Sequence, residues 1–544
     1  MKTLRIQLFR TSSQIFFFLL FLVLLGLTSL RPASGATADL HMRGPVRLFF
    51  EWDPLVALVN ALAGHAIYRG LLWSFIILIP TLFFGRFFCG WICPMGTLQH
   101  WVGSWPSESK RGKQRIDSNR YKRWQTVKYV VLLAGLVAAV FGSAVIGWLD
   151  PFSLLVRSFG LSLLPAFSIG ARAVLTPLEH SHVGFIRFTG ESLHTVLQAM
   201  LLDLRQPHYA QSVFLGIVFV GILFAGLRVT RFWCRAICPL GALLGAVSRW
   251  SVLGLHKKPE SCDNCNRCML HCQGGDNPIG GIPWHKSECL MCMNCVDACP
   301  HNGLEFRFFR NEKEVASPDL GRRRTLTGLA AGAVAVPLMR ASTGMGKSRN
   351  ERLIRPPGSL DESDFLSRCI RCGECMKACP NTALHPTLEQ AGLEGLWTPT
   401  LIPRIGYCEP SCVLCSEVCP TGAIWQITPH EKGWVVDTGQ QQPIRLGTAF
   451  YDRGRCLPWA MATDCIVCEE WCPVSPKAIY VQEAQVVDSA GNTKTLKQPH
   501  IDPSRCVGCG ACEYACPLQE HPAVYVTSIG ESRSPTSQIL LNRK

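Results

Sequence analysis

The stretch CLMCMNCVDACP at residues 289–300 follows a related stretch, CDNCNRCMLHC, at residues 262–272. In both, three cysteines are spaced three residues apart and a fourth follows four residues later. Thiolates at this spacing converge from one tight loop onto a [4Fe-4S] cluster, and the fourth cysteine usually ligates a second cluster nearby. We therefore expect one cluster on Cys262, Cys265, Cys268 and Cys299, and another on Cys289, Cys292, Cys295 and Cys272.

Four further groups of this type occur after residue 360, and the six groups together use all but four of the 28 cysteines. Five groups end in Cys-Pro, whereas Cys272 is followed by Gln273. The fourth group opens with a C-x-x-x-C step, and the first gap of the fifth group is widened. The additional predicted ligands are Cys369, Cys372, Cys375, Cys379, Cys408, Cys412, Cys415, Cys419, Cys456, Cys465, Cys468, Cys472, Cys506, Cys509, Cys512 and Cys516.

Structural zinc and disulfide bonds are the alternatives for clustered cysteines. Zinc sites normally combine two C-x-x-C halves, whereas a pattern of three plus one cysteines, repeated six times, favours six [4Fe-4S] clusters. The sequence contains no C-x-x-C-H motif. It therefore predicts no covalently attached c-type haem.

Apolar residues are concentrated before residue 230, where four stretches are near the roughly 20 residues of a membrane span. The first also resembles a secretory signal, because Lys2, Arg5 and Arg10 precede it and ASGA follows it. Its apolar run is long for a cleaved signal, so we expect an anchor. The predicted spans are 14–30, 67–88, 127–148 and 212–227.

Basic residues near the span ends predict the orientation, because Lys and Arg are retained on the cytoplasmic side. They gather between the second and third spans and after the fourth, so this side, the N-terminus and the 262–299 region are expected to be cytoplasmic. The net charge of +15 then follows from topology and requires no nucleic-acid partner. The residues are Lys110, Arg111, Lys113, Arg115, Arg120, Lys122, Arg123, Lys128, Arg228, Arg231 and Arg235.

The last four cysteines lie in two matched motifs, GRFFCGWICPMG at 85–96 and RFWCRAICPLG at 231–241. Each motif lies at the end of a predicted span, and an Asp-Pro pair precedes each of these spans. The membrane part therefore resembles an internal duplication of two similar halves. The duplication would bring Cys89, Cys93, Cys234 and Cys238 together at the cytoplasmic boundary. They could then hold an additional, seventh iron-sulfur centre. A redox-active dithiol pair and helix-end packing of reduced thiols are the alternatives.

Asp53 and Asp150 each precede a proline, which is the pattern of an N-cap followed by proline at the first helical position. We expect helix capping, and quinone or proton chemistry is the alternative. His65, His100 and His194 lack convincing spacing for haem ligation, so we expect them at the surface or in loops.

Residues 321–340 read GRRRTLTGLAAGAVAVPLMR. Three arginines before a Gly/Ala-rich run of about fifteen residues resemble a twin-arginine export signal inside the chain. A segment that acquires oxygen-sensitive clusters in the cytoplasm must cross the membrane folded, and this route exports folded cargo. Everything after about residue 341 is then expected on the outer face. The alternative is a basic linker followed by a buried helix.

The predicted fold class is multidomain. It combines an α-helical membrane bundle, with four spans plus a twin-arginine-like anchor helix, and α+β ferredoxin-like 4Fe-4S domains on both membrane faces. The predicted domains are a membrane domain at 1–250, a cytoplasmic two-cluster ferredoxin at 251–310, the signal or anchor helix at 311–345, and a periplasmic four-cluster domain at 346–544.

Residues 85–300 resemble the NapH-type membrane ferredoxins, which are quinol dehydrogenase components, through both C-x-x-x-C-P motifs and two ferredoxin groups. Residues 321–526 resemble the NapG/MauM-type exported four-cluster ferredoxins in GRRRTLTG, CIRCGECMKACP and CVGCGACEYACP. The chain departs from both families in being a fusion, in lacking a proline after Cys272 and in the opening of the fourth group. The last four groups could share cysteines sequentially or in a nested order. Related four-cluster subunits are nested, so the resemblance implies that the third and sixth groups share cysteines, and likewise the fourth and fifth.

The resemblance implies electron transfer from quinol to a periplasmic reductase or cytochrome. The residues agree, because clusters are expected on both faces of a hydrocarbon layer about 30 Å thick and no motif for substrate chemistry is present. We expect a multi-pass polyferredoxin of the bacterial inner membrane that uses the quinone pool and has no catalytic side chain of its own. Whether it is the quinol-oxidising subunit stays open. The alternative is a redox factor that assembles or reactivates a periplasmic metalloenzyme.

Overall fold

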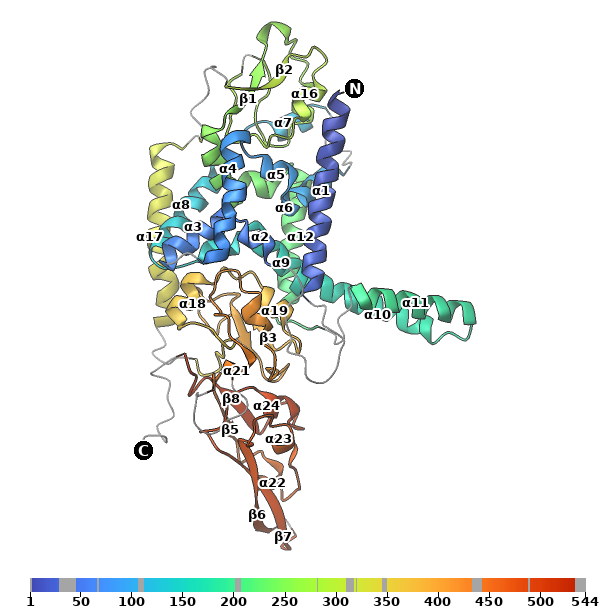
Figure 1. Cartoon of the computed structure of the whole chain (residues 1–544), viewed down its shortest axis with the longest axis vertical. Coiled ribbons are helices and arrows are strands. Elements are labelled where there is room, and N and C mark those ends of the chain that lie inside the picture. Colours follow the sequence, from blue (N-terminus) through green and yellow to red (C-terminus); the bar gives the residue numbers. More distant parts are fainter. Residues whose placement is uncertain are drawn as a thin grey trace. The chain divides into compact units, whose positions relative to one another are not determined.

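The computed structural model describes residues 2–28, 46–65, 68–105, 112–200, 207–280, 282–309, 318, 320–344, 350–432, 443–487 and 490–533. The chain divides into two compact units, shown together in Figure 1. The first unit consists of Met1–Gly26, Pro45–Phe159 and Val213–Leu338, and the second of Leu27–Gly44, Gly160–Ser212 and Met339–Lys544.

The first unit is mainly helical. Two of its helices begin at Asp-Pro pairs as expected, because the Asp53 carboxylate accepts a hydrogen bond from Leu55 N and that of Asp150 accepts one from Ser153 N. The helices are α1 (Lys2–Leu27), α2 (Leu48–Glu51), α3 (Pro54–Ala63), α4 (Phe75–Phe84), α5 (Phe87–Trp91), α6 (Pro94–Ser104), α7 (Lys113–Asn119), α8 (Val127–Val140), α9 (Pro151–Ser158), α12 (Ser212–Arg228), α13 (Phe232–Ala236) and α14 (Pro239–Val247). Short 3-10 turns lie at Arg69–Ser74, Arg123–Thr126, Val145–Trp148 and Ser248–Trp250.

Three helical stretches of the described residues are long and apolar enough to cross a membrane, namely Ile6–Leu27, Lys113–Val140 and Pro151–Glu179. The first and second correspond to predicted spans. The predicted spans at 67–88 and 212–227 correspond to the shorter apolar helices Arg69–Phe84 and Ser212–Arg228, so these two stay predictions. The third long stretch was not expected, because two arginines and internal prolines interrupt its apolar pattern. Lys110, Arg111 and the ASGA segment at 33–36 lie outside the described residues.

Aromatic side chains join the helices of the first unit. The ring centroid of Phe49 lies 5.8 Å from that of Phe21 and 5.4 Å from that of Phe152, and Phe88 lies 6.2 Å from Phe152. Phe88 is fully buried and immediately precedes Cys89. This aromatic cluster therefore fixes α1, α2, α5 and α9 around the first cysteine motif.

Two flanking strands close the part of the first unit that contains the cysteine groups at 262–272 and 289–299, which we call the inner ferredoxin region. β1 (Leu253–Lys257) precedes the first cysteine group and pairs antiparallel with β2 (Leu304–Phe308), which follows the second, with Leu255 opposite Phe306. Helices α15 (Arg267–Leu270) and α16 (Asn294–Ala298) carry cysteines of the two groups. Leu255, Trp284 and Leu304 form the core beneath them.

The helix α17 (Arg322–Gly344) contains the arginine triplet at its first turn and is 23 residues long. It packs on α8 through glycines, since a Cβ at Gly332 would lie only 2.5 Å from Ala134 O. Arg324 also donates hydrogen bonds to Thr126 Oγ1 and Arg123 O. The predicted export signal is thus a complete helix, while its function as a signal stays a prediction.

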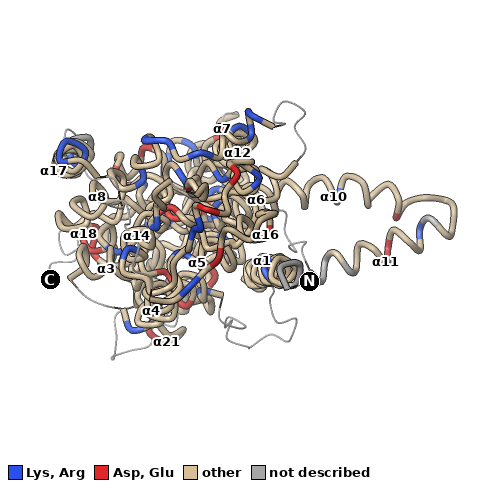
Figure 2. Tube along the Cα trace, turned by 90° about the horizontal axis from the view of Figure 1, so that it is seen from above, with Lys and Arg blue, Asp and Glu red and all other residues tan. Residues whose placement is uncertain are grey.

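In the second unit, a five-residue π turn (Phe159–Leu163) leads into α10 (Leu164–Glu179), which forms an antiparallel hairpin with α11 (Gly184–Met200) (Figure 1). Figure 2 shows how few charged residues this hairpin carries. His194 lies within α11, where it forms an ion pair with Glu179, and His100 of the first unit lies within α6. Neither histidine lies in a loop, although the His194 side chain is 31% exposed, and His65 follows the end of α3.

The remainder of the second unit is built from short helices and two-stranded sheets around the last four cysteine groups. β3 (Leu384–Pro386) pairs with β4 (Pro399–Leu401), β5 (Thr448–Tyr451) with β8 (Val524–Thr527), and β6 (Ile479–Val487) with β7 (Thr493–Ile501), all antiparallel. The helices are α18 (Glu362–Arg368), α19 (Glu374–Ala378), α20 (Leu414–Glu417), α21 (Pro429–Lys432), α22 (Leu457–Ala460), α23 (Val467–Glu470) and α24 (Ala511–Ala515).

Candidate iron-sulfur sites

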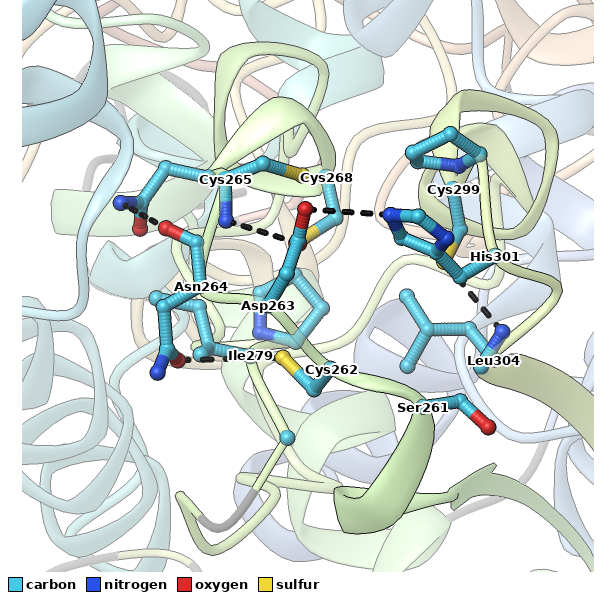
Figure 3. Close-up of a pocket in the computed structure, with 15 residues that line it drawn as sticks. Ser261, Cys262, Asp263, Asn264, Cys265, Cys268, Ile279, Cys299, His301 and Leu304 are labelled. Carbon is cyan, nitrogen blue, oxygen red and sulfur yellow. Dashed lines mark hydrogen bonds and ion pairs between the residues drawn. The ribbon is translucent and has the colours of Figure 1, made fainter.

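Four cavities are each lined by four cysteines, three from one group and one from its neighbour along the chain. Figure 3 shows the first, where Cys299 faces the loop of Cys262, Cys265 and Cys268. The other sets are Cys369, Cys372 and Cys375 with Cys419, Cys456, Cys465 and Cys468 with Cys516, and Cys506, Cys509 and Cys512 with Cys472.

Two further cysteine sets follow the same rule. Cys379 lies close enough to Cys415 to interact with it electrostatically, as do Cys408 and Cys412. Likewise, Cys272 acts on Cys295, together with Cys289 and Cys292. All six groups therefore exchange their last cysteine with an adjacent group, and the inner pair does so as the sequence predicts.

The nested arrangement expected for the last four cysteine groups, at 369–516 and called the outer groups, is wrong. The third group meets the fourth, and the fifth meets the sixth. Strand pairing is the physical reason: β5 precedes the fifth group and bonds to β8 after the sixth, so these two groups close into one ferredoxin. An isolated bridge between Ser359 and Ile424 closes the third and fourth groups in the same way.

The chemistry of these sets fits iron-sulfur clusters better than the alternatives. All 28 cysteines are free thiols, and no three Cys, His, Asp or Glu side chains among the described residues converge as a single metal ion requires. Burial raises the pKa of the Cys412 thiol to about 12 and that of Cys468 to about 11. Buried thiolates therefore need a bound cation, which an iron core supplies.

Backbone amides approach the last cysteine of several groups. Cys299 Sγ accepts a hydrogen bond from Gly303 N at 3.3 Å, and Cys379 Sγ accepts one from Ala383 N at 3.3 Å. In both cases the donor follows the cysteine by four residues, after the turn that the Cys-Pro step begins. Such amides stabilise negative charge on sulfur and raise the reduction potential of a cluster.

Two side chains near the outer sets had no signal in the sequence. Lys432 of α21 is buried and donates to Glu409 O and, at 2.7 Å, to Cys412 O. Tyr451 Oη lies 3.0 Å from Cys468 Sγ. Lys432 lies after the cysteine group that it contacts, and Tyr451 lies before the group that it contacts. Only the folded chain therefore reveals both contacts.

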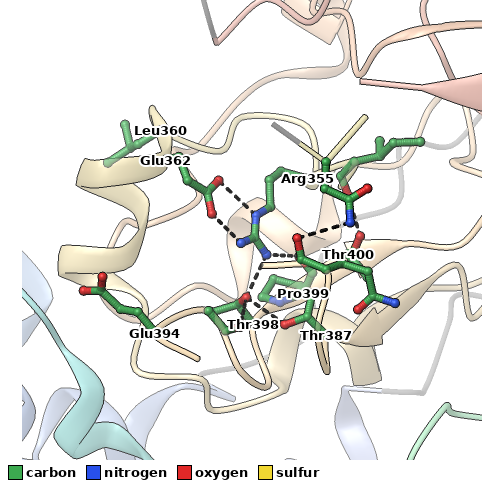
Figure 4. A network of polar contacts seen from close by, with 12 residues as sticks. Arg355, Leu360, Glu362, Thr387, Glu394, Thr398, Pro399 and Thr400 are labelled. Carbon is green, nitrogen blue, oxygen red and sulfur yellow. Dashed lines mark hydrogen bonds and ion pairs between the residues drawn. The ribbon is translucent and has the colours of Figure 1, made fainter. Parts of the chain in front are cut away.

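An ion pair between the buried Arg355 and the half-buried Glu362 supports the loop of the third group (Figure 4). Arg355 is fully buried, donates to Pro399 O at 2.7 Å, and pairs with Glu362, with Nη2 and Oε1 separated by 2.6 Å. Glu362 begins α18, which ends at the residue before Cys369. Arg355 thereby ties β4 to the helix that delivers the first ligand of this set.

The four membrane cysteines come together as the duplication predicts. All four are buried, Cys93 lies within electrostatic range of Cys89 and Cys234, and Cys238 lies within range of the other three. Each Cys-Pro step begins a helix, since Cys93 precedes α6 and Cys238 precedes α14. Proline suits the first helical position, where no amide donor is needed.

The two motifs also interlock through arginine and glycine. Arg231 Nη1 donates to Cys89 O at 2.8 Å, and a Cβ at Gly96 would lie 3.3 Å from the same nitrogen. A Cβ at Gly241 would lie 2.9 Å from Arg86 Nη2. Each arginine therefore reaches the helix start of the other motif, and the matched Arg-Phe pairs are the sequence signal for it.

The membrane motifs touch the inner ferredoxin directly. Trp91 Nε1 donates to Met291 O at 3.0 Å, and Arg86 Nη1 donates to Ser287 O at 2.8 Å. A Cβ at Gly90 would lie 2.3 Å from Leu290 O, so only glycine permits this approach. The 289–295 loop is therefore seated on the helix that carries Cys89.

Comparison with known proteins agrees with this arrangement. A 4Fe-4S binding domain matches residues 66–113 and 211–258, and another matches 365–385. A 4Fe-4S dicluster domain matches 255–300 and 461–519. Ferredoxin-type protein NapG of Escherichia coli K12 is 34% identical over 225 residues, which cover 39% of this chain and 87% of that protein. The chain belongs to the NapG/MauM ferredoxin-type proteins.

The MauM relatives give the same result. The methylamine utilization ferredoxin-type protein MauM of Methylophilus methylotrophus is 31% identical over 211 residues, covering 38% of this chain and 86% of that protein. MauM of Methylorubrum extorquens is 33% identical over 211 residues, covering 36% and 84%. No solved structure matches the chain. Membership of the NapG/MauM proteins supports multiple 4Fe-4S clusters and electron transfer through them.

Proposed function

We propose that the chain is a polyferredoxin of the inner membrane that carries electrons from quinol, through six [4Fe-4S] clusters and a seventh centre at the membrane cysteines, to a periplasmic reductase or cytochrome. The clusters would supply one-electron chemistry, and the twenty-four cysteines of the six groups would hold them. Cys89, Cys93, Cys234 and Cys238 would hold the additional centre.

The observation that carries the proposal is the direct seating of the 289–295 loop on the helix of Cys89. It brings the buried cysteine set of the inner ferredoxin next to the four membrane cysteines. Short separations are needed because electron tunnelling slows steeply with distance. A route between the membrane interior and the inner ferredoxin follows from this contact.

Within the outer ferredoxin region, the two pairs of groups also adjoin. Cys408 N donates to Cys509 O at 2.9 Å, which joins a cysteine of the fourth group to one of the sixth. A continuous path through all four outer sets is therefore available. The proposed domain limits, 1–250, 251–310, 311–345 and 346–544, assign these four sets to the periplasmic side.

The test uses purified, cluster-replete protein under anaerobic conditions. Mixing with duroquinol should change the visible absorbance of the clusters, and reoxidation by duroquinone should reverse the change. The apoprotein, with iron removed, is the control for nonspecific quinol oxidation. If the clusters exchange no electrons with either form of the quinone, the proposed role of quinol is wrong.

A further inference from the structure

Two buried arginines of the membrane motifs have hydrogen-bond donors without a partner. Arg86 is 1% exposed and Arg231 is fully buried. In both side chains, Nε and Nη2 have no hydrogen-bond partner among the described residues. Burial of guanidinium donors without hydrogen-bond partners is strongly unfavourable, so the unpaired nitrogens indicate a bound negative group.

Both side chains lie near the four cysteines. Arg231 donates through Nη1 to Cys89 O, and both Arg231 and Arg86 lie close enough to Cys234 to interact with it electrostatically. The site expected for a Cβ at Gly241 lies 2.9 Å from Arg86 Nη2 and 3.4 Å from Cys238 Sγ. The two guanidinium groups therefore approach the thiols from opposite motifs.

Two helix N-termini provide a second, independent preference for negative charge. α6 has 11 residues and α14 has 9, and both begin immediately after a cysteine of the set. Cys238 Sγ accepts a hydrogen bond from Gly241 N at 3.2 Å. Backbone amides and the helix dipole both favour an anion at such a position.

We propose that Arg86 and Arg231 balance the charge of an anionic iron-sulfur cluster held by Cys89, Cys93, Cys234 and Cys238, and thereby raise its reduction potential. This inference rests on the seventh centre of the proposed function. Four thiolates outweigh the positive iron core, so the cluster is an anion and each reduction adds one negative charge. A pair of neutral dithiols would supply no negative charge to Arg231 and would leave Arg86 to share the Glu288 carboxylate with Lys128.

The experiment is a potentiometric titration of the full-length, cluster-replete protein, followed by electron paramagnetic resonance. In R86Q and R231Q, the ratio of reduced to oxidised cluster at a fixed applied potential should fall about tenfold for one centre, which equals a midpoint about 59 mV lower. The other centres should keep their midpoints. In R86K and R231K the midpoint of this centre should stay close to that of the unmodified protein, because lysine keeps the positive charge.

R157Q is the matched control. Arg157 is also fully buried in the helical part of the first unit and donates to Trp148 O at 2.7 Å, but its charge acts on the Asp150 carboxylate. G241A is a milder variant that displaces the Arg86 guanidinium without removing its charge, and it should lower the same midpoint by a smaller amount. This variant keeps the inference testable if a glutamine variant fails to assemble.

The outcomes separate the two claims. If the unmodified protein contains iron for six clusters only and shows no seventh spectrum, both the seventh centre and the role of the arginines are overturned, whereas quinol oxidation by the other clusters is unaffected. If the seventh spectrum is present and its midpoint is the same in R86Q, R231Q and G241A, only the role of the arginines is overturned.

Discussion

At the scale of single residues, buried cations determine how this protein can hold negatively charged groups. Lys432 caps the carbonyls of the 408–412 loop, and Arg355 ties α18 to β4. A cation in a low-dielectric interior must be paired, so each marks a position where negative charge is held. Substitution of these residues, and not only of the cysteines, should therefore lower the stability of the regions that hold the clusters.

Glu362→Gln should destabilise the outer ferredoxin region. Although burial opposes ionisation, Arg355 and Arg533 hold the pKa of Glu362 at about 2, compared with about 4.3 in an unfolded chain. The stabilisation is present above the unfolded pKa and is lost as pH falls through about 2. We expect a loss of about 2 kcal/mol that is constant from pH 8 to pH 5.

The measurement is the guanidinium midpoint for loss of cluster absorbance at several pH values. Glu389→Gln, at an exposed position, should leave the midpoint unchanged. A difference between Glu362→Gln and the unmodified protein that disappears near pH 6 would assign the effect to another group.

Paired serine variants test the exchange of cysteines. Cys369→Ser with Cys419→Ser removes two residues of one cavity, so the protein should lose the iron of one cluster. Cys408→Ser with Cys419→Ser affects two sets, and the iron of two clusters should be lost. Iron and sulfide analysis of the purified variants distinguishes the cases. Loss of two clusters from both variants would support the nested arrangement, and loss of two from the first variant with loss of one from the second would show that the groups exchange no cysteine.

At the scale of elements, small residues decide which helices can lie close together. α17 approaches α8 at Gly328 and Gly332, where a Cβ at Gly328 would lie 3.1 Å from Leu133 Cδ2. Close backbone approach through small residues is the usual way in which helices associate in membranes. α17 is therefore a packed helix, although its apolar run alone is short for a span.

Gly332→Ala should weaken this contact, since the new Cβ would lie 2.5 Å from Ala134 O and 2.7 Å from Val137 Cβ. Overpacking of this kind typically costs about 1 to 3 kcal/mol. The thermal midpoint of the detergent-solubilised protein should fall. Gly170→Ala is the matched helical control, because nothing lies within 4 Å of its Cβ position. Equal midpoints for both variants would show that α17 does not pack on α8.

At the scale of the whole molecule, the chain combines ferredoxin regions that must reach different compartments if the proposed function holds. The inner region is part of the same compact unit as the membrane motifs. The last four groups belong to the other unit and follow the arginine-led helix. The arginine triplet is thus the element on which the location of the outer clusters depends.

Reporter fusions test this topology. Alkaline phosphatase fused after residue 533 should be active, and fused after residue 309 it should be inactive, because it folds only outside the cytoplasm. Replacement of Arg322 and Arg323 by lysine should abolish activity of the first fusion if the twin-arginine route exports this domain. Full activity of that variant would show that the helix crosses the membrane by another route.

The sequence by itself determined the six cysteine groups, the exchange within the inner pair and the two Asp-Pro caps, because these features depend on spacing within a few residues. Only the tertiary structure decided that the third group meets the fourth, that Arg86 and Arg231 cross between motifs, and that 151–179 is a long apolar helix. These depend on which distant segments pair: β5 and β8, for example, join residues on either side of two cysteine groups. Local spacing fixes how a loop converges on a cluster, whereas packing between distant segments selects the loop that faces it.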